Sequence, residues 1–318
     1  MGHEDYLKLS NDGKTVIECK KDYQDAVEIP NSVTEIGDRA FSDCTNLKMI
    51  EIPDSVTKIG SLAFSDCSNL TKIEIPENMT EIGYLAFYGC TSLNNIIIDD
   101  KNTYYCLKDG VLYSYNLKTL VAVLGKIDTL IVPDRVTKLG NYSFYGCTSL
   151  KSIEIPDEVT EIGDYSFAGC TNLAKIEMPD YLTKIGVAGF TSCTSLTTIK
   201  IPDGVTEIGK FAFNGCTSLT SIEIPDSVTK IGEKAFDGCT SLTSIEIPDS
   251  VTKIGSKAFS GCISLVELHL RYNNPIDLSD NFENLDISKI KLYVPIGKGF
   301  AYRHHSFYSQ FKEIVTEK

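Results

Sequence analysis

Nine of the eleven cysteines recur at one place in a repeated motif, so the chemistry of their thiols is the first question. They are Cys44, Cys67, Cys90, Cys147, Cys170, Cys193, Cys216, Cys239 and Cys262; Cys19 and Cys106 lie outside the series. A zinc site needs ligands that converge on one point, and a disulfide needs Cβ atoms that face each other. One thiol per repeat, with all side chains pointing the same way, fits neither. We expect reduced, buried, slow-reacting thiols, and neither a metal nor a cofactor.

Carboxylates form a second periodic set, at the middle position of the motif I-E-I. The column runs Glu28, Glu51, Glu74, Ile97, Ile131, Glu154, Glu177, Lys200, Glu223, Glu246 and His269. Strand alternation places this position on the face opposite the core. Stacked carboxylates repel one another, although solvent reduces the cost to roughly a fraction of a kcal/mol per pair. Three interpretations stay open: solvated residues copied by duplication, an acidic face for a basic partner, and calcium binding, which lacks an Asp-rich loop.

Two isoleucines, Ile97 and Ile131, interrupt this acidic column on neighbouring repeats. They lie near the Tyr104–Tyr105 loop of the one repeat that is longer than the others. We expect the hairpin in that repeat to fold over both isoleucines and bury them. The alternative is an exposed apolar spot with a polar rim, which resembles a protein-binding patch.

The sequence contains few residues and motifs that are typical of an enzyme. It has four histidines, His3, His269, His304 and His305, and lacks the nucleophile-elbow, phosphate-loop and zinc-protease motifs. A catalytic pair of carboxylates needs two unlike environments that separate the pKa values, whereas a periodic column repeats one environment. We therefore expect a protein without catalytic residues.

The elements that carry these columns follow a period of 23 residues. The spacing of the prolines gives this period; they are Pro30, Pro53, Pro76, Pro133, Pro156, Pro179, Pro202, Pro225 and Pro248. Each unit has a short strand that ends at Pro and a second, V-T-x-I-G, that ends at Gly. The segment x-x-A-F-x-G-C between Gly and Cys is too short for a stable helix and is expected to form a helical turn. A unit this small must stack on its neighbours to bury its Leu, Ile and Phe columns.

Charges inside V-T-x-I-G alternate along most of the stack. The column is Glu35, Lys58, Glu81, Lys138, Glu161, Lys184, Glu207, Lys230 and Lys253. Opposite charges on adjacent strands attract, so we predict a ladder of surface ion pairs, each worth at most ~1 kcal/mol.

Both ends and one repeat depart from the period. Residues 1–29 are expected to cap the stack with a hairpin, residues 30–270 to form the repeats, and residues 271–318 to form a C-terminal cap with a strand, a turn and a short helix. The long repeat, 99–132, is expected to contain a second hairpin that pairs Val111–Tyr113 with Leu120–Val123.

Charge and hydropathy exclude some partners. The net charge of −13 repels phosphate, so a nucleic-acid partner is not expected. No apolar run approaches the ~20 residues of a membrane helix, so membrane insertion is not expected, and the N-terminus does not read as a signal peptide.

The pattern L-x-x-I-x-I-P-x-x-V-T-x-I-G-x-x-A-F-x-x-C resembles the BspA-like (Treponema-type) leucine-rich repeats, from about Glu28 to Leu270. The resemblance implies a right-handed leucine-rich-repeat horseshoe of about eleven turns whose strand face lies on the concave side and binds partners. It also implies a secreted or cell-surface adhesion protein that binds a protein, such as a host extracellular or cell-surface protein. A basic ligand would suit the glutamate column.

The candidate binding residues are Ile97, Tyr104, Tyr105, Ile131, Glu154, Glu177, Lys200, Glu223 and Glu246. Two other functions stay open. A carbohydrate-binding surface module would need exposed aromatic residues, and Trp is absent. An intracellular scaffold in the cytoplasm would suit the many unpaired thiols.

Overall fold

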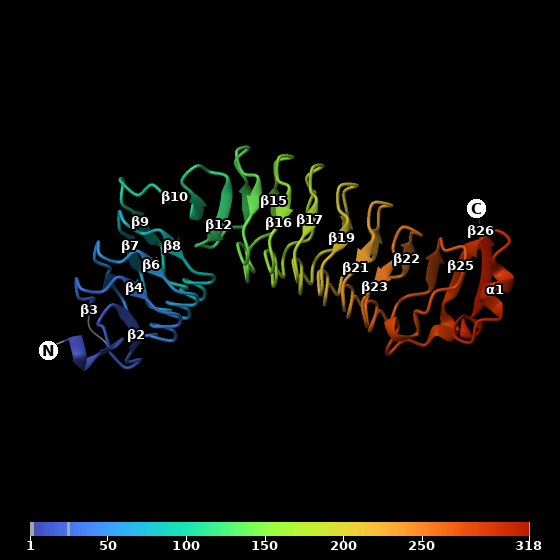
Figure 1. Cartoon of the computed structure of the whole chain (residues 1–318), viewed down its shortest axis with the longest axis horizontal. Coiled ribbons are helices and arrows are strands. Elements are labelled where there is room, and N and C mark those ends of the chain that lie inside the picture. The colour runs from blue at the N-terminus through green and yellow to red at the C-terminus, as the bar shows by residue number, and fades with distance from the viewer. Residues whose placement is uncertain (1–2, 24–25, 318) are drawn as a thin grey trace. The chain divides into compact units, whose positions relative to one another are not determined.

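The structure is a computed structural model that describes residues 3–23 and 26–317. The chain divides into two compact units, Met1–Lys126 and Ile127–Lys318, and each is described by itself. In both units the repeats are successive turns of a solenoid, as expected (Figure 1). The described part of the chain has about 13 turns rather than eleven, because β25 and β26 of the C-terminal cap each add one.

The first unit begins with the predicted hairpin, in which β1 (Leu7–Leu9) pairs antiparallel with β2 (Thr15–Cys19) after a short 3-10 helix, η1 (His3–Asp5). The V-T-x-I-G strands β4 (Glu35–Ile36), β6 (Lys58–Ile59) and β8 (Glu81–Ile82) continue this sheet in parallel. The I-E-I strands form a second row: β3 (Val27–Glu28), β5 (Ile50–Glu51), β7 (Lys72–Ile75) and β9 (Asn95–Ile98). The hairpin therefore covers the open end of the V-T-x-I-G row.

The long repeat contains the predicted hairpin and one more strand. Strand β11 (Val111–Ser114) pairs antiparallel with β12 (Thr119–Val123), and β10 (Tyr105–Lys108), which was not foreseen, pairs with β11. The buried side chain of Asn102 ties the start of this meander to the preceding repeat. Its amide donates to the carbonyls of Pro76 (2.9 Å) and Met79 (3.1 Å), and its oxygen accepts the amides that begin β10.

The second unit repeats the two rows. One row contains β13 (Thr129–Ile131), β15 (Ser152–Glu154), β18 (Thr198–Lys200), β20 (Ser221–Glu223), β22 (Ser244–Ile247) and β24 (Glu267–Leu270). The other contains β14 (Lys138–Leu139), β16 (Glu161–Ile162), β17 (Lys184–Ile185), β19 (Glu207–Ile208), β21 (Lys230–Ile231) and β23 (Lys253–Ile254). All observed pairings between these strands are parallel and in register, so side chains one repeat apart stack into columns.

The C-terminal cap extends the first of these rows. Strand β25 (Lys291–Pro295) pairs in parallel with β24, and β26 (Glu313–Glu317) pairs with β25. Three 3-10 helices and one short α-helix complete the cap: η2 (Ser279–Asn281), η3 (Ile287–Lys289), α1 (Gly299–Arg303) and η4 (Tyr308–Gln310). The predicted strand, turn and short helix are β25, the turn at Gly297 and α1; the last strand, β26, was not foreseen.

The prediction of a helical turn in x-x-A-F-x-G-C is wrong. In the first unit, Arg39 and Asp43 have positive φ (58° and 61°), and this left-handed conformation interrupts a helix. Alternate amides bond to the next repeat, as Phe41 does to Ala63 (2.7 Å) and Asp43 to Ser65 (2.8 Å), while the amides between them close turns within the segment, as Ser42 does to Arg39 (3.0 Å). These turns therefore form a third set of hydrogen bonds between successive repeats.

Phenylalanine and cysteine columns form the core on this side. Stacked rings run from Phe144 to Phe259 with centroids 4.8–5.6 Å apart, and the series continues to Phe282 in the cap. Seven of the nine column thiols donate to the carbonyl of a phenylalanine 26 residues earlier, as Cys216 does to Phe190 (3.1 Å), whereas Cys44 donates to the carbonyl of Cys19 (3.9 Å). The sulfur thus packs in the core and also satisfies a carbonyl.

All eleven cysteines are free thiols. Seven of the nine column members are buried, while Cys90 and Cys147 are partly exposed. Burial raises the pKa of the Cys216 and Cys262 thiols to about 12. Slow reaction of these thiols stays a prediction.

The ion-pair ladder of the V-T-x-I-G row is confirmed. The Lys58 ammonium lies 3.4 Å from Glu35 and 3.6 Å from Glu81. In the second unit Glu161 contacts Lys138 (2.8 Å) on one side and Lys184 (2.9 Å) on the other. The hydrogen bond from Lys138, followed by that from Lys184, lowers the pKa of Glu161.

Candidate binding groove

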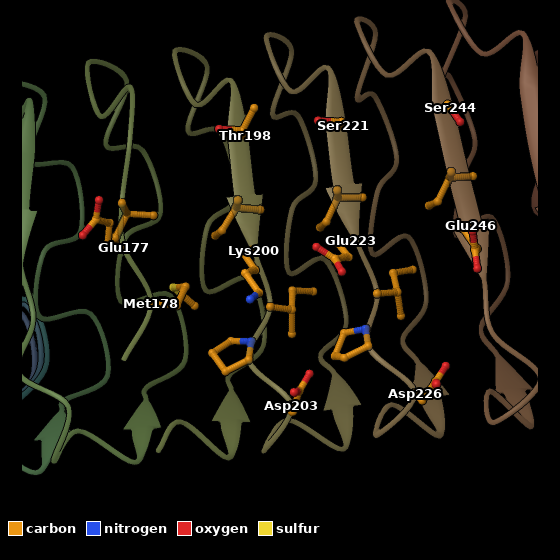
Figure 2. A pocket seen from close by; sticks show the side chains of 18 of the residues that line it. Glu177, Met178, Thr198, Lys200, Asp203, Ser221, Glu223, Asp226, Ser244 and Glu246 are labelled. Atoms are coloured by element: carbon orange, nitrogen blue, oxygen red, sulfur yellow. The ribbon is translucent and has the colours of Figure 1, made fainter. Parts of the chain in front are cut away.

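A groove of about 1090 Å³ runs along the second unit, over the outer face of the I-E-I row. It is lined by residues of 175–180, 198–203, 221–226 and 244–246, together with His269. Figure 2 shows Lys200, Glu223 and Glu246 on successive turns, with Asp203 and Asp226 at the bend that follows each strand. Successive turns therefore contribute equivalent residues to the groove, one from the middle of the I-E-I strand and one from the bend that follows it.

Strand alternation explains which side chains line it. In β20, Ile222 is buried on the core side, whereas Ser221 and Glu223 on either side of it are exposed. Pro225 ends this strand because it lacks an amide hydrogen, and the chain bends so that Asp226 lies at the groove margin. The glutamate column is thus solvent-facing, as its alternation predicts.

At both ends of the groove the charges are paired. Lys175 contacts Glu177 within one turn (2.7 Å), and this hydrogen bond lowers the pKa of Glu177. At the other end, the Arg271 guanidinium donates to both oxygens of Glu246 (2.7 and 2.9 Å) and lowers its pKa. These carboxylates already have cationic partners.

The middle of the groove is different. Lys200 and Glu223 are neighbours in register on β18 and β20, yet neither side chain has a hydrogen bond or ion pair with any residue that the structure describes. The same holds, within residues 3–23 and 26–317, for the carboxylates of Asp180, Asp203 and Asp226. The unpaired charges of the groove are therefore four carboxylates and one ammonium group.

Free hydroxyls lie beside these charges. In the described structure, Thr198, Ser221 and Ser244 line the groove without a hydrogen-bond partner in the protein. By contrast, the neighbouring Thr220 hydroxyl donates to the carbonyl of Thr197 (3.1 Å). The groove hydroxyls are thus available to donate to a ligand or accept from it.

At one end of the groove, His269 and Glu246 contact an aromatic and charged cluster of residues that follow the last repeat. The His269 ring stacks on Tyr293 with centroids 4.3 Å apart, and its Nδ1 lies 2.8 Å from Glu317. Arg271 also contacts Glu317 (3.1 Å). Sequence reasoning placed His269 in the column but missed Tyr293, Arg271 and Glu317, because the 23-residue period ends here and no signal places them near it.

The expectation that the hairpin buries both isoleucines is wrong. Ile131 in β13 is 71% exposed and lies in register beside Glu154 of β15, which is also exposed and lies outside the groove lining. In the first unit, Ile97 in β9 is 41% exposed and pairs in register with Glu74. Residues that pair within a parallel row leave their outward side chains in solvent unless another layer covers them.

The two candidate tyrosines behave differently from each other. Tyr104 is half-exposed and is available to a partner. The Tyr105 hydroxyl accepts a hydrogen bond from the amide of Ile82 (3.0 Å) and donates to the carbonyl of Thr80 (3.3 Å). Tyr105 therefore holds the meander to the preceding repeat.

In the part of the chain that the structure describes, no three His, Cys, Asp or Glu side chains gather in a way that could hold a metal ion. No helix among residues 3–23 and 26–317 is long and apolar enough to cross a bilayer.

Comparison with known proteins identifies the repeat. The BspA type leucine rich repeat region matches residues 19–128, 123–241 and 183–310 in six copies. A leucine rich cell surface protein from Faecalibacterium prausnitzii is 32% identical, with a TM-score of 0.55, over 80% of this chain and 61% of that protein. A leucine-rich repeat protein from Eubacterium ventriosum is 25% identical over 80% of both chains, with a TM-score of 0.62. One from Bacteroides ovatus is 25% identical over 98% of this chain and 74% of its own, with a TM-score of 0.53.

The chain thus spans less than two thirds of the F. prausnitzii protein. No curated protein matches it in sequence. The family match covers most of the chain. The chain belongs to the BspA-type leucine-rich repeat family.

Proposed function

We propose that the chain is a non-enzymatic protein-interaction module, and that the groove of its second unit binds a basic polypeptide segment. The observation that carries the proposal is the charge left over in the groove. Apart from the Lys175–Glu177 and Arg271–Glu246 pairs, the charged groups of the groove are four carboxylates and one ammonium group. An excess of unpaired carboxylates steers and orients a cationic partner.

The related structures support a surface role. The F. prausnitzii protein is described as a cell surface protein, and it is similar to 80% of this chain. We extend that location to this chain, as a secreted or surface-attached protein that adheres to proteins outside the cell. An intracellular scaffold would use the same groove, so fractionation of the source cells with antibodies against the chain separates the two locations.

A carbohydrate ligand has less support. Protein sites for sugars usually present aromatic faces, and the only aromatic ring among the groove lining residues in the described structure is that of His269. One face of that ring already stacks on Tyr293.

Other exposed residues are secondary candidates for the same role. In the second unit, Ile131 and Glu154 lie beside each other at the start of the I-E-I row. In the first unit, Ile97 and Tyr104 are exposed. If these residues contribute, Ile97→Glu and Ile131→Glu together will weaken partner capture while leaving the fold intact.

The test is capture of extracellular and cell-surface proteins by the full chain and by a groove variant. The variant reverses three unpaired charges: Asp203→Lys, Glu223→Lys and Asp226→Lys. A matched control reverses three exposed carboxylates of the first unit, Glu28, Glu51 and Glu77, and therefore has the same net charge. We expect roughly tenfold weaker capture of basic partners by the groove variant, and weaker capture by the native chain at high salt.

Equal loss in the groove variant and in the control would contradict the proposal, because the binding would then follow net charge. Undiminished binding by the groove variant would contradict it as well. Circular dichroism of all three proteins verifies that the substitutions leave the fold unchanged.

A further inference from the structure

One cation interrupts the outward column of the groove. In the second unit this column reads Ile131, Glu154, Glu177, Lys200, Glu223, Glu246 and His269. Lys200 is its only lysine, in a turn that reads T-T-I-K-I-P where others read S-I-E-I-P. Packing does not require this residue, because the position is exposed and the glutamates of neighbouring turns occupy it without distortion.

Most of the lysines in the repeats of the same unit have carboxylate partners, although Lys253 has none in the described structure. Lys184 contacts Glu161 across one turn at 2.9 Å, and Lys175 contacts Glu177 within its own turn at 2.7 Å. Lys200 has Glu223 as its neighbour in register, the same relation that Lys184 has to Glu161, and still forms no ion pair in the described structure. An exposed pair would in any case be worth at most ~1 kcal/mol, so a ligand can engage both groups at small cost.

The surroundings of Lys200 divide the groove. The unpaired carboxylates of Glu223 and Asp226 lie on the next turn, and Asp203 follows Lys200 in its own turn (Figure 2). The preceding turn contributes the unpaired carboxylate of Asp180 to the groove lining. Successive turns are ~4.8 Å apart, and alternate side chains of an extended peptide are ~7 Å apart. A peptide that crosses the turns obliquely, so that each step of ~7 Å advances one turn of ~4.8 Å, can place one side chain over Lys200 and the next side chain on the same face over carboxylates on each side.

We propose that Lys200 sets the register of an extended polypeptide ligand with the pattern basic-x-acidic-x-basic. The acidic side chain pairs with Lys200, and the two basic side chains pair with the carboxylates on either side. Thr198 and Ser221, whose hydroxyls lie next to Lys200 and Glu223, supply hydrogen bonds to the peptide backbone. This inference rests on the proposed function. It specifies which basic segments the groove prefers, namely those with an acidic residue between two basic ones.

The experiment measures binding of fluorescent peptides to the full chain by anisotropy. Three peptides share one frame: Lys-Ser-Asp-Ser-Lys, the same peptide with Ser in place of Asp, and the same peptide with Lys in place of Asp. We expect the Asp peptide to bind roughly fivefold more tightly than the Ser peptide, about the worth of one exposed ion pair, and the Lys peptide to bind more weakly than the Ser peptide.

Variants of the protein sharpen the measurement. Lys200→Glu is expected to reverse the order, so that the Lys peptide binds most tightly. Lys200→Met keeps the aliphatic stem and is expected to remove the preference without reversing it. Lys253→Glu is the matched control, since Lys253 is exposed, has no ion pair in the described part of the second unit and does not line the groove. It should retain the native order of the three peptides.

The outcomes separate the two proposals. If none of the three peptides binds, the proposed function itself fails for this groove. If all three bind and follow only total positive charge, in the native chain and in Lys200→Glu alike, the register is wrong while the basic groove stands.

Discussion

The two strand rows of the second unit share one period and nearly the same residue types, yet they use their charges differently. In the V-T-x-I-G row, lysine and glutamate alternate and pair across turns, as Glu161 does with Lys138 and Lys184. In the I-E-I row, most positions have the same sign, and Lys200 and Glu223 remain unpaired although they are neighbours. The difference teaches that a periodic column of charged residues indicates a binding site only where those residues are not already paired with each other within the solenoid.

The largest expected effect comes from breaking the scaffold that both rows share. Phe213 is fully buried and stacks between Phe190 and Phe236, with centroids 5.4 and 5.5 Å away. Phe213→Ala leaves a cavity in this column and should lower the free energy of unfolding by about 3–5 kcal/mol. Urea denaturation followed by circular dichroism measures it.

Phe300→Ala is the control for that substitution, since Phe300 is 72% exposed. A loss of similar size in both variants would mean that the ring column is not the source of the stability.

The thiol column should produce the next largest effect, at alkaline pH. Burial raises the folded pKa of Cys216 and Cys262 to about 12, above the ~8.5 of an unfolded thiol. Above pH ~8.5 the unfolded state loses these protons while the folded state keeps them, so stability falls as pH rises towards 12. Denaturation midpoints from pH 7.5 to 10.5 test the slope.

Cys216→Ala removes one of the two thiols and should make that slope shallower. Native thiols should also label slowly with a disulfide reagent at pH 8, whereas unfolded protein labels fully. Rapid labelling of most column thiols in the native protein would contradict the prediction that they react slowly.

The smallest effect compares the two rows directly. Glu161→Gln removes two ion pairs and should destabilise the fold by at most about 1 kcal/mol, whereas Glu223→Gln should leave stability unchanged within roughly 0.5 kcal/mol. Because the folded pKa of Glu161 is lowered, its contribution is present above the unfolded pKa near ~4.3 and is lost as pH falls through the folded value.

A loss of stability in Glu223→Gln as large as that in Glu161→Gln would show that the I-E-I row also serves the scaffold. The comparison needs both variants measured at neutral pH and again near pH 3, where only the difference due to Glu161 should shrink.

Prediction from the sequence succeeded where one residue type has one physical reason to recur. The Phe column, the Pro-ended strands and the N-terminal hairpin are confirmed. Each depends on burial or on turn formation, and these are set by residues within one repeat or by the same residue type in the next repeat. The helical turn failed, because residues such as Arg39 adopt a left-handed conformation only when the next repeat supplies carbonyls for the released amides. Burial of Ile97 and Ile131 failed because the strands of the long repeat pair with one another and leave the outward side chains of β9 and β13 in solvent.

The candidate site was predicted in part. The alternation of I-E-I placed Glu177, Lys200, Glu223 and Glu246 on one exposed face, and all four line the groove. Their pairing could not be predicted, since Arg271, which pairs with Glu246, and Tyr293, which stacks on His269, come from a region without the period. Their function as binding residues remains our proposal.

The sequence by itself determined the repeat, its period, the columns and the family, because each depends on the order of residues within 23 positions. Only the tertiary structure decided which charges are left over. Glu177 and Glu246 have the same place in the motif as Glu223, yet Lys175 and Arg271 neutralise them and nothing described neutralises Glu223. Pairing depends on distances between side chains of different turns, and a one-dimensional period contains no such distances.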